Sequence, residues 1–450
     1  MTTRFQSYAT RAVPRYTSYP TAPHFSDQVD DATYASWLKA LKPTKPVSVY
    51  LHVPFCRQIC WYCGCNMKLA AKDAPINEYA AMLVREIDLV ADRLPQRMKI
   101  SHLHWGGGTP TALSPVALTR AMEQLADRFE FAPRAELAIE SDPRTLTEDM
   151  IWTIGGLGFT RASFGVQEFD PTVQLAINRV QPPEMVRASV EGLRLAGLKG
   201  INFDLIYGLP HQTVETLTRT IELSAEMRPD RVALFGYAHV PWMAKKQRMI
   251  DEAALPGTAD RLAQSKAAAE ALIKAGYVAI GLDHFALPHD PLAIAAQKGT
   301  LRRNFQGYTT DTAQTMLGVG ASSIGRTPEG YVQNIGETRS WSRAVEAGRL
   351  PVARGIALSN EDKLRAWVIE ALMCRGHVDL EEAGSRYGTP ADWHSDLDPE
   401  LDQMEADGVI VRHGKEQVEM AQGAGQLVRT VAAVFDTYLK AKQTGHSVAV

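Results

Sequence analysis

The chain has 450 residues, with 48 lysines and arginines against 51 aspartates and glutamates, which gives a formal net charge of −3. At about 150 residues per domain this length gives roughly three structural units, although a single barrel can occupy well over a third of such a chain. With 45% hydrophobic and 22% charged residues, the composition excludes collagen, a coiled-coil rod and intrinsic disorder. The near-neutral charge gives no global attraction to nucleic acid or anionic membranes.

The N-terminal sequence and the hydropathy pattern favour a soluble cytoplasmic protein. Residues 1–21 carry charge and proline but no apolar stretch of the secretory type. No segment reaches the roughly 18 consecutive apolar residues of a membrane span. Four of the five cysteines fall between residues 56 and 65, which suits metal binding or redox chemistry in a reducing compartment better than a disulfide scaffold.

From residue 47 onward, short β-rich runs alternate with helical patterns, which is typical of parallel βα units. The expected strands lie at 47–53, 100–105, 135–140, 161–166, 201–207 and 231–237. The expected helices lie at 77–95, with Asn77 as its N-cap, and at 115–129, 147–157, 182–196 and 213–227. Six such units build an α/β fold, either an open doubly wound sheet or a curved partial barrel, and periodicity does not separate the two.

The whole chain is expected to fall into four consecutive parts. Residues 1–45 form an N-terminal arm with no periodic helix before Tyr34–Leu41, and residues 46–300 form the βα core. Residues 301–357 are a connecting segment that contributes to the active site. Residues 358–450 form a smaller, mainly helical C-terminal domain that closes with a helix over 426–440.

Polar or glycine-rich residues follow or end each predicted strand. They are the cysteine loop, the Gly106-Gly107-Gly108-Thr109 turn, Glu140, Gln167, Asp204 and the Tyr237-Ala238-His239 segment. In parallel βα proteins the carboxyl ends of the strands build the ligand site. The sequence therefore predicts one large site that draws on all six strands.

The cysteine loop, HVPFCRQICWYCGCN, separates its four cysteines by three, two and one residues. A structural zinc site normally takes a second Cys or His pair from a distant segment, and a thioredoxin-like motif needs only two of the four cysteines. The three-then-two spacing instead allows Cys56, Cys60 and Cys63 to hold one iron-sulfur cluster with one iron left open. This spacing directly after the first strand favours redox chemistry.

The spacing resembles that of the radical S-adenosylmethionine superfamily, in which three cysteines hold a 4Fe-4S cluster and S-adenosylmethionine chelates the fourth iron. Further motifs resemble those of the oxygen-independent coproporphyrinogen III oxidases, also called dehydrogenases. They are PRYTSYPTA (14–22), YLHVPFC and CWYCGCN (50–66), HWGGGTPT (104–111), IESDPR (139–144), GVQEFD (165–170), NFDLIYGLP (202–210) and LRRNFQGYTT (301–310). The resemblance spans nearly the whole chain and implies a partial (β/α)6 barrel.

The resemblance also implies roles for individual residues. Cys56, Cys60 and Cys63 would be the cluster ligands, while Cys65 is the family's extra cysteine, of unassigned role. Two S-adenosylmethionine molecules are expected. The positions that match the first are Tyr50, Gly107, Glu140 and Ile324, and those that match the second are Tyr62, Gly108, Thr109, Gln167, Arg179, Asp204 and Ala238.

The implied reaction is the oxidative decarboxylation of two propionates of coproporphyrinogen III to vinyl groups, which yields protoporphyrinogen IX in porphyrin and haem biosynthesis. An external electron donor and an external acceptor are expected partners, and a monomer is expected. Because the substrate carries four carboxylates, we expect a local basic rim formed by Arg15, Lys68 and Arg302 or Arg303.

Other residues receive structural interpretations. His52, His104, His239 and His284 have no i,i+4 metal spacing and are expected to be hydrogen-bonded structural residues, and Cys374 is expected in a core. The alternatives are a haem chaperone of the same family, another radical enzyme acting on a tetrapyrrole, and a zinc protein. Chaperone relatives are expected to lack the PRYTSYPT arm and the fourth cysteine, and this chain has both.

Overall fold

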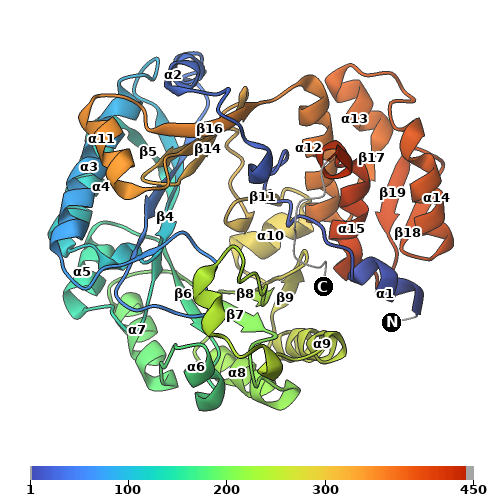
Figure 1. The fold of residues 1–450 in the computed structure, drawn as a ribbon, viewed down its shortest axis with the longest axis horizontal. Helices are drawn as coiled ribbons and strands as arrows, with labels where there is room; N and C mark the ends of the chain where they lie inside the picture. The colour runs from blue at the N-terminus through green and yellow to red at the C-terminus, as the bar shows by residue number, and fades with distance from the viewer. Residues whose placement is uncertain (1–2, 442–450) are drawn as a thin grey trace. The chain divides into compact units, whose positions relative to one another are not determined.

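The computed structural model describes residues 3–441, and the chain divides into two compact units (Figure 1). One unit joins Phe25–Ala275 with Asp311–Ala357 and contains the predicted strands. The other joins the residues up to His24, Gly276–Thr310 and the described residues from Leu358 onward. The four consecutive parts expected from the sequence are a different division of the chain and remain a prediction.

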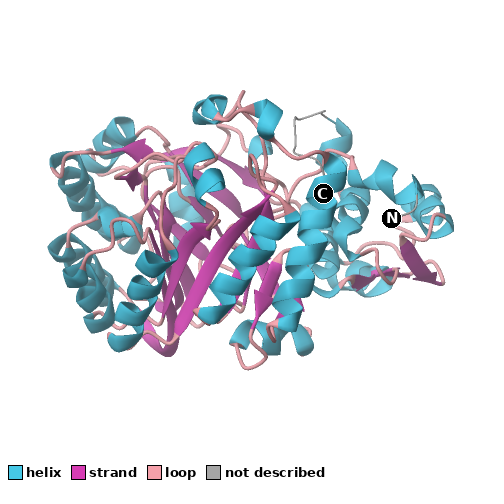
Figure 2. Cartoon of the chain, turned by 90° about the horizontal axis from the view of Figure 1, so that it is seen from below, coloured by secondary structure: helices cyan, strands magenta, loops and turns pink. Residues whose placement is uncertain are grey.

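The unit that begins at Phe25 is built on six parallel strands, as predicted. The strands are β1 (Val47–Val53), β4 (Lys99–Gly107), β5 (Glu130–Ser141), β6 (Arg161–Gln167), β7 (Gly200–Tyr207) and β8 (Arg231–Gly236). They pair in this order, each parallel to the next. The result is the curved sheet of a partial barrel, flanked by helices (Figure 2).

Helices connect these strands and lie along the outer side of the sheet in Figure 1. They are α3 (Ala74–Ala91), α4 (Pro115–Arg128), α5 (Glu148–Gly156), α6 (Pro171–Ala176), α7 (Pro183–Leu195), α8 (Val214–Glu226) and α9 (Thr258–Lys274). Ser114, Thr147 and Thr213 cap α4, α5 and α8 by accepting hydrogen bonds from backbone N–H groups. The expected cap of α3 is wrong, because the helix begins at Ala74, where a proline in the first turn suits a helix start.

Residues 311–357 extend the sheet beyond β1, which the sequence did not predict. β13 (Met316–Val319) pairs parallel with β1, and β14 (Ile324–Arg326), β15 (Gly330–Asn334) and β16 (Val352–Ala357) follow in antiparallel order. α11 (Thr338–Glu346) connects the last two strands, and α2 (Asp31–Lys39), near the start of this unit, matches the helix expected after Tyr34. β13, β14 and β15 have only three to five residues each, which carry too little periodicity to be detected in the sequence.

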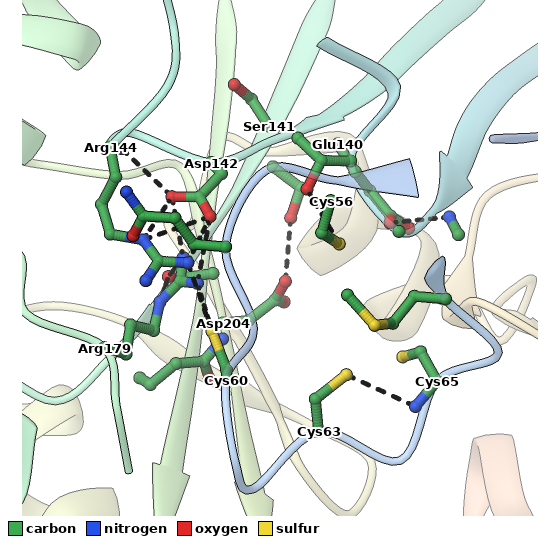
Figure 3. Close-up of a pocket in the computed structure, with 18 of the residues that line it drawn as sticks. Cys56, Cys60, Cys63, Cys65, Glu140, Ser141, Asp142, Arg144, Arg179 and Asp204 are labelled. Carbon is green, nitrogen blue, oxygen red and sulfur yellow. Dashed lines mark hydrogen bonds and ion pairs between the residues drawn. The ribbon is translucent and has the colours of Figure 1, made fainter. Parts of the chain in front are cut away.

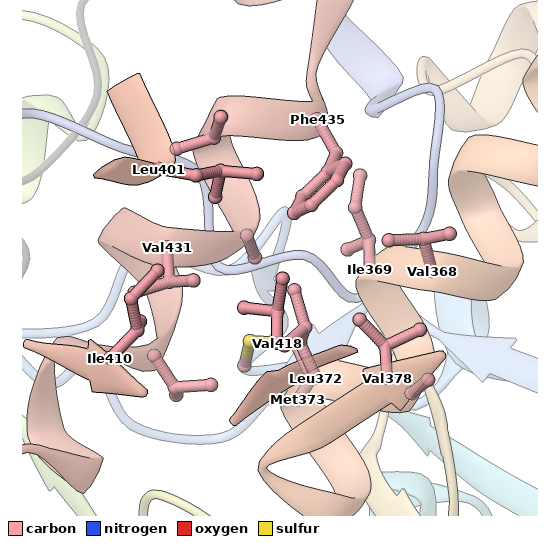
Figure 4. Packing of buried hydrophobic residues seen from close by; sticks show 14 of the residues in the cluster. Val368, Ile369, Leu372, Met373, Val378, Leu401, Ile410, Val418, Val431 and Phe435 are labelled. Atoms are coloured by element: carbon pink, nitrogen blue, oxygen red, sulfur yellow. The ribbon is translucent and has the colours of Figure 1, made fainter. Parts of the chain in front are cut away.

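The other unit is mainly helical and has its own apolar core (Figure 4). Its helices are α1 (Thr3–Ala9), α10 (Pro291–Gln297), α12 (Asn360–Arg375), α13 (Leu380–Tyr387), α14 (Asp398–Ala406), α15 (Val428–Ala432) and α16 (Thr437–Ala441). Its strands are β9 (Val278–Ile280), β10 (His284–Ala286), β11 (Arg302–Asn304), β12 (Gly307–Thr309), β17 (His377–Asp379), β18 (Ile410–His413) and β19 (Gln417–Met420). Tyr8, Tyr16 and Tyr19 of the N-terminal segment are buried in this core, so this part of the arm packs within the unit.

Two expectations for this unit were wrong. The N-terminal segment contains α1, a helix too short to give a clear periodic signal. The closing helix is broken at Asp436, where the backbone becomes extended. The Asp436 carboxylate then accepts hydrogen bonds from the N–H groups of Tyr438 and Leu439, and an aspartate that caps a new turn in this way favours a helix start over a helix interior.

A buried carboxylate joins α3 to the extension of the sheet. Glu86 is 1% exposed and accepts hydrogen bonds from the Gly320 N–H at 2.7 Å, the Asn334 amide at 2.6 Å and the Trp341 indole at 2.9 Å. Burial raises its pKa to about 7, although the three donors oppose the shift. The side chain therefore favours its protonated form far more in the folded chain than in the unfolded chain.

This difference predicts a pH-dependent stability. The pKa of Glu86 is higher in the folded chain than in the unfolded chain. Its contribution to the free energy of unfolding is therefore fully present below about pH 4 and declines as the pH rises to about 7. At about 1.4 kcal/mol per pKa unit the loss is about 3 kcal/mol. Denaturant unfolding across this pH range should show that Glu86→Gln removes this decline. The exposed Glu78→Gln on the same helix should keep it, and identical pH profiles for Glu86→Gln and the unchanged protein would refute the assignment.

Candidate active site

The cysteine loop begins where β1 ends and is closed by a short parallel pair of strands, β2 (Phe55–Cys56) and β3 (Lys68–Leu69). The Ala70 N–H donates to the Cys56 carbonyl at 3.0 Å, and the Asn178 amide donates to the Ile59 carbonyl at 2.7 Å. All four cysteines of the loop are free thiols. The loop is therefore fixed at its base and along its length, while its thiols stay free to act as ligands.

The loop and the carboxyl ends of β4 to β7 enclose a cavity with about 760 Å³ of space, part of it open to solvent (Figure 3). The predicted site residues that line it are Cys56, Cys60, Tyr62, Cys63, Cys65, Gly107, Gly108, Thr109, Glu140, Gln167, Arg179 and Asp204. Those not in its lining are Tyr50, Ala238 and Ile324. The lining comes from the cysteine loop and the ends of β4 to β7, whereas the expected contribution from the end of the sixth strand, β8, is not part of it.

The glycine turn after β4 lets backbone approach the cavity wall closely. Gly107 has a φ of +116°, and a Cβ at this position would lie 2.6 Å from the His52 imidazole. A Cβ on Gly108 would lie 2.8 Å from the Phe55 carbonyl oxygen. The Gly107 N–H donates to the Glu140 carboxylate at 3.2 Å. Glycine is required here for both conformation and space.

Two buried arginines surround Asp142 and contact the cysteine loop. Arg144 binds the Asp142 carboxylate at 2.6 Å and donates to the Cys60 sulfur at 3.2 Å. Arg179 donates to the same sulfur and to Asp142 at 3.3 Å each, and to the Gly165 carbonyl at 2.9 Å. Burial opposes ionisation of Asp142, but the two guanidinium groups outweigh it and lower its pKa. The network therefore places positive charge beside the Cys60 thiol.

The thiols differ in acidity because their surroundings differ. Burial raises the pKa of Cys56 to about 11, partly opposed by the Thr109 hydroxyl, which donates to its sulfur at 3.4 Å. Hydrogen bonding with Cys65 lowers the pKa of Cys63 to about 6 against the effect of burial, and the Lys246 charge helps. Metal ligation requires thiolates, which the surroundings of Cys63 favour and those of Cys56 oppose.

Polar groups also lie on the opposite wall, at β6 and β7. The Asp204 carboxylate accepts from Ser163 at 3.1 Å and from Asn202 at 2.9 Å. Gln167, at the end of β6, has a φ of +67° and is 7% exposed, and its amide oxygen has no hydrogen-bond partner within residues 3–441. A buried acceptor without a partner is costly unless a ligand supplies the donor, so this wall fits a polar ligand such as S-adenosylmethionine.

The three predicted residues outside the lining have other contacts. The Tyr50 ring stacks on His104, and its hydroxyl bonds to His52 at 3.0 Å. The Ala238 carbonyl accepts from Gln247 at 3.1 Å, and the same amide group donates to the Tyr62 carbonyl. Ile324 pairs with Gln333 in the sheet extension. Their contact with S-adenosylmethionine remains a prediction.

Several lining residues were not identified from the sequence as site residues. They are Gln58, Met67, Ser141, Asp142, Arg144, Ser163 and Gly165. Asp142 and Arg144 lie in the IESDPR motif, which was the available signal. The pairing of Asp142 with Arg179 joins residues 37 positions apart in the sequence, which no local pattern shows.

The arrangement of the thiols suits a cluster better than a single metal ion. Within residues 3–441, no three His, Cys, Asp or Glu side chains could hold one metal ion together. Cys56, Cys60 and Cys63 nevertheless face a common cavity. Three cysteine thiols facing one cavity provide the sulfur-only ligand set of a 4Fe-4S cluster.

Each of the four histidines considered in the sequence analysis has a hydrogen-bonding partner. His104 bonds to Glu140 at 3.1 Å, His239 to Glu252 at 3.0 Å and His284 to Asp283 at 2.7 Å. His52 bonds to Tyr50 and, at 3.3 Å, to Ser322. Cys374 is half-buried and packs against a small apolar cluster that includes Ile280 and Tyr308.

The predicted basic rim residues are engaged within their own units. Lys68 donates to Glu337 at 3.2 Å and to Thr338 at 2.5 Å. Arg302 pairs with Glu370 at 3.0 Å. Arg303 lies 4.4 Å from the Tyr308 ring and donates to the Arg15 carbonyl at 3.3 Å. Binding of substrate carboxylates by these residues stays a prediction.

Among the described residues, no helix combines the length and the apolar character needed to span a bilayer.

Comparison with known proteins agrees with this site. The sequence profile of the Radical SAM superfamily matches residues 50–224. The oxygen-independent coproporphyrinogen III oxidase of Bradyrhizobium diazoefficiens is 48% identical over 99% of this chain and 98% of its own. The corresponding protein of Helicobacter pylori is 39% identical over 97% and 96%.

A solved structure gives the same result for the fold. The coproporphyrinogen III oxidase of Escherichia coli, described as a radical SAM enzyme, superimposes with a TM-score of 0.90 and 36% identity. The match covers 95% of this chain and 100% of that one. The chain therefore belongs to the oxygen-independent coproporphyrinogen III oxidase family of radical SAM enzymes.

Proposed function

We propose that this chain is an oxygen-independent coproporphyrinogen III oxidase, which decarboxylates two propionates of coproporphyrinogen III to vinyl groups and forms protoporphyrinogen IX. One observation carries the proposal: three free thiols face one cavity together with a glycine turn, Glu140 and the Asp142 network. Near full-length similarity to relatives of that name supports it.

Cys56, Cys60 and Cys63 would hold the 4Fe-4S cluster, and the cavity beside them would receive S-adenosylmethionine. When bound, the reduced cluster and S-adenosylmethionine supply a carbon radical able to remove a hydrogen atom from the substrate. The backbone at Gly107 and Gly108 gives close access to the ligand, and Glu140 offers carboxylate oxygens as acceptors. Gln167 and Asp204 provide polar groups on the other wall.

The protein's own contribution is to position and protect the reacting groups. Each oxidative decarboxylation releases carbon dioxide and one electron in addition to the hydrogen atom removed, so an external acceptor is required.

The buried network around Arg144 and Arg179 keeps positive charge next to Cys60. Hydrogen bonds and charge at a cluster sulfur are known means of setting its reduction potential, and these two arginines would do so here.

The direct test is an anaerobic assay with reductant, S-adenosylmethionine and coproporphyrinogen III. We expect protoporphyrinogen IX and 5'-deoxyadenosine to appear together, measured by chromatography. Cleavage of S-adenosylmethionine without a vinyl product would reject the substrate and leave another radical enzyme acting on a tetrapyrrole. Tight haem binding without either product would favour the chaperone.

The cluster assignment predicts a selective loss of iron. Cys56→Ser, Cys60→Ser and Cys63→Ser should each lose most of the roughly four irons that a 4Fe-4S cluster contributes, together with its visible absorbance. Cys374→Ser, which removes a thiol that packs against an apolar cluster, is the matched control and should keep both. Cys65→Ser should also retain iron, and loss of iron in this variant would make Cys65 a ligand.

The glycine turn predicts a binding defect. Gly107→Ala would place a methyl group against the His52 ring at a positive φ, and strain of about 1–3 kcal/mol is expected. If the turn shifts to relieve this strain, calorimetry with cluster-loaded protein should show S-adenosylmethionine binding weakened about 5- to 150-fold, since 1.4 kcal/mol corresponds to a factor of ten. Gly156→Ala in α5 meets nothing within 4 Å and should bind normally. Unchanged affinity in Gly107→Ala would argue against ligand contact at this turn.

A further inference from the structure

The segment of residues 239–250, called here the 239–250 loop, combines exposed apolar and basic side chains. Trp242, Met243 and Met249 are 64%, 72% and 60% exposed. Lys245, Lys246 and Arg248 fall within one short 3-10 helix, and the loop contains no aspartate or glutamate. In a chain of net charge −3 this is a local basic and apolar surface. Aromatic residues, methionine and arginine are enriched where proteins bind one another.

The 239–250 loop is attached directly to the cysteine loop. Gln247 is 1% exposed, and its amide group donates to the Tyr62 carbonyl at 2.7 Å and to the Ala238 carbonyl at 3.1 Å. Its oxygen accepts from the Val240 N–H at 2.6 Å. Lys246 donates to the Cys65 carbonyl at 3.2 Å. A partner bound on this loop would therefore lie next to the cysteines.

The cysteine loop is itself exposed at this point. Gly64, Cys65 and Asn66 are exposed, whereas Cys60 is buried beside the two arginines. An electron can reach a buried redox centre only from a donor that approaches closely. The exposed side of the cysteine loop and the adjoining 239–250 loop together provide such an approach.

We propose that the 239–250 loop is the docking surface for an acidic one-electron carrier protein that reduces the cluster. The inference rests on the proposed function, which requires an external donor. Residues 239–250 carry three cations and no acid, although Asp251 and Glu252 follow directly and Glu252 binds His239. The cations favour an acidic partner, because complementary charges steer encounter and fix orientation. Trp242 and Met243 would supply the apolar centre of the contact.

The electron balance is simple. The reduced carrier loses one electron and leaves oxidised, and that electron is taken up at the centre held by Cys56, Cys60 and Cys63. No bond forms between the two proteins, and no proton has to move. The contact is transient, which suits a small surface with a polar, charged rim.

The experiment uses cluster-loaded protein and a chemically reduced plant-type ferredoxin as the probe carrier. Stopped-flow absorbance would measure the rate of cluster reduction in the double variant Lys245→Glu/Arg248→Glu and in Trp242→Ser. Lys246 is left unchanged because it contacts the cysteine loop. We expect the double variant to slow reduction about tenfold at low ionic strength, with the difference shrinking as salt screens the charges.

Lys199→Glu/Lys274→Glu is the matched control. These exposed lysines lie just before β7 and at the end of α9, outside the loops at the carboxyl ends of the strands. This variant makes the same change in net charge and should be reduced by ferredoxin at the normal rate. Equal slowing in the control and the loop variant would mean that only total charge matters and would overturn the proposal.

A second readout separates docking from catalysis. With dithionite, a small reductant that needs no docking surface, the loop variants should form protoporphyrinogen at the unaltered rate. Loss of activity with both reductants would assign the loop to substrate binding and overturn the proposal, as would normal reduction of both loop variants by ferredoxin. Failure of the unaltered protein to form product with dithionite would reject the proposed function, while the reduction rates would still decide where the carrier docks.

Discussion

The site depends on one buried ion network, the Asp142 carboxylate held between Arg144 and Arg179. Two guanidinium groups beside one another would repel, and burying either without a partner is expensive, so the carboxylate makes their approach to Cys60 possible. Because Arg179 also donates to the carbonyl of Gly165 in β6, the network joins the cysteine loop to two strand ends. Residues from three separate segments of the sequence thereby fix the position of the Cys60 thiol.

The parallel sheet explains why such distant residues meet. The parallel strands β1, β4, β5, β6, β7 and β8 deliver their following loops to the same end of the sheet, and residues from the first five of these strands or their loops surround one cavity. The extension through β13 to β16 lies on the other side of β1 and is joined to α3 by the buried Glu86. The unit thus has a rigid frame on both sides of the cysteine loop.

The cysteine loop meets two environments. Around Cys60 it contacts buried arginines, whereas at Tyr62 and Cys65 its backbone accepts hydrogen bonds from the exposed 239–250 loop. The first environment would set the reduction potential of the bound cluster, and the second would be where the proposed electron carrier docks. The glycine turn on the cavity wall leaves no room for a side chain beside His52 and Phe55.

The sequence by itself determined the six strands, the cysteine spacing and most of the cavity lining, because strand periodicity and local motifs are short-range properties. It did not show the extension of the sheet, the break at Asp436 or the role of Asp142. The sheet extension and the Asp142 network depend on partners far apart in the chain, β13 beside β1 and Arg179 on Asp142. At Asp436 a hydrogen bond from the distant Tyr16 adds to the local capping bonds. Burial and pairing of polar groups exist only once the chain is folded, so the tertiary structure decided them.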